Sequence, residues 1–169
     1  MPIVSADIDF RLSGGAANSD PNAALGGAKS STEITAASLH NLFDQVASAE
    51  SSAGDVEYRC FYVHNAHATL ALQNAVIWIQ ANTPASDTTV DIGLGTSAVN
   101  GTEQTVANES TAPSGVTFSA PATEGAALSI GNIPAGQHKA VWVRRTISAA
   151  AAANNLDNVV LRVKGDTAA

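Results

Sequence analysis

Short runs of β-branched and aromatic residues recur along the chain after Asp55 and set the expected architecture. Residues 76–80 (VIWIQ) are nearly all strand formers, and residues 88–94 (TTVDIGL) alternate apolar and polar positions. Turn-forming residues separate the runs. The expected strands are 56–63, 70–80, 88–94, 115–119, 128–133, 139–147 and 158–164. About seven short strands at this spacing are typical of an all-β fold built as a single β-sandwich, either immunoglobulin-like or a jelly roll.

The first 54 residues differ in composition from the rest of the chain, so we expect the chain to have two parts. Residues 12–29 are rich in glycine and alanine and contain almost nothing large to bury, which predicts an extended N-terminal arm. Apolar residues then recur near helical spacing and predict one short amphipathic helix over about 34–47, with Gly54 as the stop. These residues are Ile34, Leu39, Leu42, Phe43 and Val46. Residues 55–169 form the predicted sandwich.

Composition and charge narrow the classes of function. Charged residues make up 14% of the 169-residue chain, the net charge is −7 and the eight lysines and arginines are scattered, which argues against a nucleic-acid partner. No apolar stretch approaches the roughly 18 residues of a membrane span. The first ten residues lack the basic start and apolar run of a secretory signal. We therefore expect no membrane partner and assembly in a cytoplasm.

The residues that carry chemistry elsewhere do not form a recognisable motif here. His64 and His67 flank a predicted turn without an evident third metal ligand, and Cys60 lies in a predicted strand without a neighbouring base. The glycines fit neither a phosphate-binding loop nor a nucleophile elbow. We therefore predict no catalytic residue, no cofactor and no metal ligand, and we expect that the protein is not an enzyme.

A small set of residues is predicted to contact other subunits. Three are the large apolar anchors of the predicted arm, and two are adjacent arginines in a predicted strand, whose side chains point to opposite faces. They are Ile8, Phe10, Leu12, Arg144 and Arg145. For the arginines there is an alternative, in which one is buried against a carboxylate such as Glu57 or Asp91.

Several segments resemble known families. Residues 61–79 (FYVHNAHATLALQNAVIWI) and 128–143 (LSIGNIPAGQHKAVWV) resemble immunoglobulin-like β-sandwich modules, which implies a fold but little about function. Residues 30–65, 136–151 (GQHKAVWVRRTISAAA) and 158–167 (NVVLRVKGDT) resemble structural proteins of tailed bacteriophages.

The second resemblance implies a virion protein of the capsid decoration, or cement, type. Such a protein bridges neighbouring major capsid subunits and associates with itself, for example as a trimer, and it reaches the virion after assembly in the host cytoplasm. One alternative is a structural component of the neck or tail. A second alternative is a carbohydrate- or receptor-binding β-sandwich, which would need an exposed tryptophan, whereas we expect Trp78 and Trp142 in the core.

Overall fold

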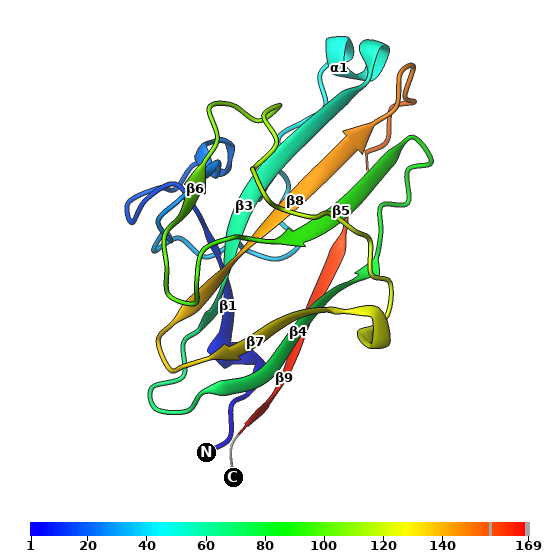
Figure 1. Cartoon of the computed structure of the whole chain (residues 1–169). Coiled ribbons are helices and arrows are strands. Elements are labelled where there is room, and N and C mark those ends of the chain that lie inside the picture. Colours follow the sequence, from blue (N-terminus) through cyan, green and yellow to red (C-terminus); the bar gives the residue numbers. More distant parts are fainter. Residues whose placement is uncertain (156, 168–169) are drawn as a thin grey trace.

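The computed structural model describes residues 1–155 and 157–167 and is built around two main β-sheets packed together (Figure 1). The larger sheet has the order β1-β3-β8-β5, with bounds Ile8–Leu12, Asp55–Asn65, His138–Ile147 and Thr88–Leu94. The smaller sheet has the order β7-β4-β9, with bounds Leu128–Ile133, Leu72–Ala81 and Val160–Thr167. All of these neighbours are antiparallel. The predicted all-β sandwich is therefore confirmed.

The remaining elements are short. β2 (Gly26–Gly27) pairs with β6 (Glu103–Thr105) outside the two main sheets. The α-helix α1 spans Ser48–Ala53. Three single-turn 3-10 helices complete the described elements, η1 (Ser5–Asp7), η2 (Pro21–Ala23) and η3 (Glu124–Ala126). Across the described residues, the helices are all too short or too polar to cross a membrane.

Apart from β6, the chain changes sheet at every strand from β3 onward. β3, β5 and β8 belong to the larger sheet, whereas β4, β7 and β9 belong to the smaller one. Strands that pair are therefore distant in sequence, and Glu57 of β3 lies opposite Arg145 of β8. The sandwich forms only when such distant segments meet, which is typical of slowly folding β proteins.

The larger sheet is buried on both faces. One face packs against the smaller sheet through side chains that include Phe61 and Val143. The other face presents Tyr62 and Trp142, and loops cover it. These loops contribute Leu25, Val106, Val116 and Phe118. Residues Glu57–Val63 are consequently buried without interruption, which explains why this stretch shows no simple alternation of apolar and polar residues.

Polar anchors fasten the covering loops to the sheet near Tyr62. Its hydroxyl donates to the Gly27 carbonyl (2.5 Å) and accepts from the backbone N–H of Glu103 (3.0 Å). The Glu103 carboxylate accepts from the Ser97 N–H (2.8 Å) and the Thr96 hydroxyl (3.1 Å). Burial of this carboxyl acts to raise its pKa, but the hydrogen bonds together outweigh burial and lower the pKa to about 2.

Much of the segment predicted to be an arm lies against the larger sheet. β1 pairs with β3 along its whole length. The outer edge of β1 is itself paired, because the Ser30 N–H donates to the Leu12 carbonyl (2.8 Å) and the Ile34 N–H donates to the Phe10 carbonyl (2.7 Å). The first 54 residues therefore contribute a strand and its outer neighbour to the same sheet as residues 55–169.

The helix predicted over 34–47 is wrong. These residues form turns, and the α-helix begins only at Ser48, although it ends at Gly54 as expected. Ala37 and His40 have φ angles of 61° and 55°, a left-handed conformation that a continuous helix cannot contain. Three of the five apolar residues of the segment nevertheless pack against the core between the sheets from this irregular backbone, whereas Leu39 is 81% exposed. The three are Ile34, Leu42 and Phe43.

Replacing Glu103 with glutamine should destabilise the fold at neutral pH and much less in acid. The folded-state pKa is about 2, below the ordinary value of 4.5, so the stabilisation is present above pH 4.5 and is lost as the pH falls toward 2. We expect the free energy of unfolding to drop by about 2 kcal/mol at neutral pH, because charge-assisted hydrogen bonds are lost.

Denaturant unfolding over a series of pH values measures this effect. Glu33→Gln, at an exposed glutamate, is the matched control and should change little. A loss of stability in Glu103→Gln that is the same in acid and at neutral pH would contradict the assignment.

Candidate functional site: a buried arginine and carboxylate cluster

Three of the predicted interface residues lie on β1 and are largely covered by their own chain. Leu12 is 2% exposed. Ile8 and Phe10 are partly buried against the core between the sheets, and the Phe10 ring centroid lies 5.0 Å from that of Phe61. Because β1 is a strand of the larger sheet, Leu12 is not accessible to another subunit in the folded chain.

Arg144 and Arg145 point to opposite faces of β8, and each pairs with a carboxylate. The Nε of Arg145 donates to Oε2 of Glu57 (2.5 Å). On the other face, Arg144 donates to Oδ2 of Asp91 through Nε (3.1 Å) and Nη2 (2.7 Å). The predicted alternative, in which one arginine is buried against a carboxylate, is thus met by Arg145 and Glu57, and Arg144 forms an ion pair with Asp91. Arg145 is buried, whereas Arg144 keeps part of its side chain at the surface.

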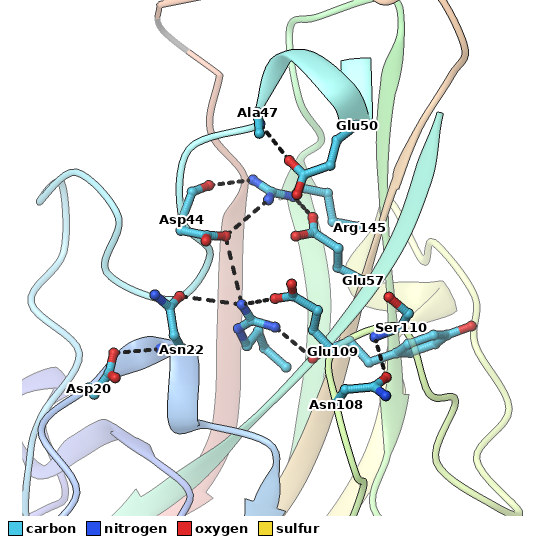
Figure 2. Close-up of polar contacts among 12 residues, drawn as sticks. Asp20, Asn22, Asp44, Ala47, Glu50, Glu57, Asn108, Glu109, Ser110 and Arg145 are labelled. Carbon is cyan, nitrogen blue, oxygen red and sulfur yellow. Dashed lines mark hydrogen bonds and ion pairs between the residues drawn. The ribbon is translucent and has the colours of Figure 1, made fainter. Parts of the chain in front are cut away.

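Arg59 is the centre of a polar cluster that the sequence analysis did not identify. Its side chain is fully buried, and its Nη2 donates to Oε2 of Glu109 (2.5 Å) and Oδ1 of Asn22 (3.3 Å). The same nitrogen lies 3.7 Å from Oδ1 of Asp44. Figure 2 shows that Asn22, Asp44 and Glu109 converge on one point from separate segments of the chain.

Backbone hydrogen bonds attach two of these segments to the part of β3 that β1 leaves uncovered. The Tyr58 N–H donates to the Glu109 carbonyl (2.7 Å), and the Cys60 N–H donates to the Ala24 carbonyl (2.7 Å). Arg59 lies between these two residues on β3. Its side chain therefore binds loops that the neighbouring backbone groups already hold at the sheet edge.

One aromatic ring joins the two guanidinium groups. The Cζ of Arg145 lies 4.7 Å from the Phe43 ring centroid, and the Cζ of Arg59 lies 5.5 Å from it, both within cation–π range. The carbonyl of the next residue, Asp44, accepts from Nη1 of Arg145 (2.9 Å). The two arginines together hold this short segment against the larger sheet.

The cluster and its immediate surroundings contain more negative than positive charge. Two guanidinium groups form ion pairs with the carboxylates of Asp44, Glu57 and Glu109, and the carboxylates of Glu50 and Asp55 lie beside Glu57. Burial raises the pKa of Glu57, although its ion pair with Arg145 acts in the opposite direction. Only Oε2 of Glu57 meets Arg145, and Oε1 has no hydrogen-bond partner among the described residues.

The histidines and the cysteine have separate surroundings. Nδ1 of His64 lies 3.3 Å from Oδ2 of Asp9. His67 accepts backbone N–H groups at Nδ1, and its Nε2 donates to the Met1 carbonyl (3.2 Å). Cys60 is fully buried, and burial raises the pKa of its thiol, so it is not in the thiolate form that nucleophilic chemistry needs.

The cluster is chemically suited to holding loops in place. Guanidinium groups stay charged throughout the physiological pH range, so Arg59 and Arg145 bind carboxylates and carbonyls without exchanging protons. A surface cavity of about 370 Å³ lies beside them, lined by Asn22, Leu25, Asp44, Ala107, Asn108 and Glu109.

Comparisons with protein-family models, curated proteins and solved structures found no match. The role of the cluster therefore rests on its own geometry.

Breaking the buried Glu57–Arg145 pair on one side should cost more than removing both charges. Arg145→Met leaves Glu57 buried without its partner, so we expect the free energy of unfolding to fall by about 3–5 kcal/mol. The free energy of unfolding of the Glu57→Gln, Arg145→Met double variant should be about 2 kcal/mol higher than the sum of the two single losses predicts.

Equilibrium denaturant unfolding of the two single variants and the double variant measures this coupling. Arg144→Met is the matched control, and it should cost about 1 kcal/mol or less because its ion pair with Asp91 is partly exposed. Strictly additive losses at Glu57 and Arg145 would show that the pair is not energetically coupled.

Proposed function

We propose that this protein is a structural virion component that decorates a bacteriophage capsid and stabilises it by bridging neighbouring major capsid subunits. The resemblance of residues 30–65, 136–151 and 158–167 to tailed-phage structural proteins supports this function. The partners are the major capsid protein and further copies of the chain, for example in a trimer. The protein joins the virion in the host cytoplasm, and the role involves no catalysis, nucleic acid or membrane.

The observation that carries the proposal is that buried charged groups fix the loops of the sandwich. A protein that bridges subunits gains from surfaces that are already ordered, because ordering loops on binding costs free energy. Arg59 and Arg145 bind loop groups at one place on the larger sheet. Elsewhere, Nζ of Lys139 donates to the carbonyls of Gly95 (2.8 Å) and Ser97. These contacts favour a pre-ordered contact surface.

Two neighbouring features are suited to contact with other subunits. β9 is an edge strand of the smaller sheet, and within residues 1–155 and 157–167 no strand pairs with its outer edge. An open edge can accept a strand from a partner. Met1 and Val4 are exposed apolar residues close to the end of β9, where the Ile3 N–H donates to the Thr167 hydroxyl (3.2 Å) (Figure 1).

The two alternatives differ in their support. A neck or tail component would use the same ordered sandwich and would differ in copy number. A carbohydrate-binding module usually presents an aromatic side chain as a stacking surface. Trp142 is 0% exposed and Trp78 is 8% exposed, so neither tryptophan offers that surface. The neck or tail alternative is therefore the stronger of the two.

Copy number in virus particles tests the proposal. In particles of the phage that encodes this chain, quantitative mass spectrometry should find it in a ratio near one to one, or a simple fraction of that, with the major capsid protein. A few copies per particle would instead indicate a neck or tail component. Absence from particles would overturn both structural functions.

A pair of substitutions tests the contact surface within the same assay. Val4→Ser should lower the amount of the protein retained on particles, because it removes an exposed apolar contact. Leu39→Ser is the matched control, since Leu39 is 81% exposed but lies in the turns between β2 and α1. Equal retention of the two variants would contradict the assignment of this surface.

A further inference from the structure

We propose that Glu50, Asp55 and Glu57 bind a divalent cation of the calcium class where α1 meets β3. The proposal goes beyond the structural function, since it concerns a property of the isolated chain. Glu50 lies in the first turn of α1 and Asp55 and Glu57 lie in the first residues of β3, with Gly54 at a φ of 78° between the two elements. Asp55 and Glu57 are two positions apart on a strand, so their side chains share one face.

The spacing of the oxygen atoms fits a single ion. One carboxylate oxygen from each of the three residues lies within 4.8 Å of the other two. Calcium binds oxygen ligands at about 2.3–2.6 Å, so three oxygens at this spacing can contact one ion. Magnesium binds at about 2.1 Å in a strict octahedron and accepts irregular sites less readily. The geometry therefore favours calcium.

An independent observation indicates that a positive partner is missing. The Glu57 side chain is fully buried, and its Oε1 has no hydrogen-bond partner among the described residues. A buried carboxylate oxygen without a donor is costly because it has lost its hydration. A bound cation at Oε1 offsets this cost.

The other two ligands are oriented by local hydrogen bonds. Oε2 of Glu50 accepts from the Ala47 N–H (2.5 Å), and Oδ1 of Asp55 accepts from the Val56 N–H (2.7 Å). Each bond leaves the second oxygen of the carboxylate without a hydrogen-bond partner among the described residues. Glu50 and Asp55 are partly exposed, so water can complete the coordination of the ion.

The local charge distinguishes this site from a second acidic group nearby. Asp44, Glu57 and Glu109 also bring carboxylate oxygens within 4.8 Å of one another, but Arg59 and Arg145 occupy that space. At Glu50, Asp55 and Glu57, Arg145 supplies positive charge through its bond to Glu57 (Figure 2), and Arg59 acts on Glu57 through space. The three carboxylates and Arg145 together carry a formal charge of −2, which a divalent cation neutralises.

Calcium titration of the purified, metal-free chain tests the proposal. At constant ionic strength, Tm should rise by about 5 °C or more when Ca²⁺ reaches about 100-fold above Kd. Isothermal titration calorimetry should give one Ca²⁺ per chain, with much weaker binding of Mg²⁺. If Ca²⁺ causes no heat of binding and no change in Tm, or if Mg²⁺ and Na⁺ stabilise equally well, the site does not exist.

Two conservative variants locate the ion. Glu50→Gln and Asp55→Asn should each weaken Ca²⁺ binding at least about tenfold while leaving the metal-free Tm close to that of the unmodified chain. Both positions are partly exposed, so at least one variant should fold. Glu33→Gln, an exposed glutamate outside the site, is the matched control and should bind Ca²⁺ normally. Binding that survives both variants would overturn the assignment. These measurements need no virus particles, so their outcome is separate from that of the proposed function.

Discussion

The larger sheet has to exclude water from both of its faces, since Phe61 and Val143 on one side and Tyr62 and Trp142 on the other are each at most 1% exposed. The smaller sheet covers only the first of these faces. The second face is covered by loops, which would otherwise be expected to lie free in solvent. Because both coverings are required, segments without regular secondary structure become part of the folded core.

Loops that cover a sheet need hydrogen-bond partners for their buried polar groups, and buried side chains supply these partners. On one part of the larger sheet, Tyr62 binds the Gly27 carbonyl and Lys139 binds loop carbonyls. On another part, Arg145 binds the Asp44 carbonyl, and Arg59 binds the side chains of Asn22 and Glu109. Removing one member of a buried charged pair is costly, so such contacts select one loop arrangement over others. Apolar packing alone is less selective, because these loops contain few large side chains. The polar anchors thus account for the order that the proposed bridging function requires.

The sequence predicted the elements whose pattern is local. The strand over residues 88–94 has the predicted bounds. Val90 and Ile92 share one buried face of this strand, and Thr89 and Asp91 point to the opposite face. Residues 115–119 were also predicted as a strand, but they form only an isolated bridge between Ile92 and Ser119. Val116 and Phe118 instead serve as part of the loop covering of the outer face. The sequence therefore indicates that these two residues are buried, but it does not indicate that they cover the outer face of the larger sheet.

In the charged cluster, too, the contacts set by local geometry could be predicted, and those that depend on the whole fold could not. The opposite orientations of Arg144 and Arg145 follow from strand geometry, so pairing with Glu57 or Asp91 was predictable. The contacts of Arg59 could not be predicted, because its partners Asn22 and Glu109 come from loops whose positions depend on the whole fold.

The central claim is that loops and sheet form one ordered unit, and amide hydrogen exchange measured residue by residue by NMR tests it most directly. The informative amides are those of Tyr58 and Cys60, which donate to the loop carbonyls of Glu109 and Ala24. The account predicts that these amides are protected as strongly as those in the β3–β8 ladder. Exchange at the rate of an open loop, while the ladder stays protected, would contradict it.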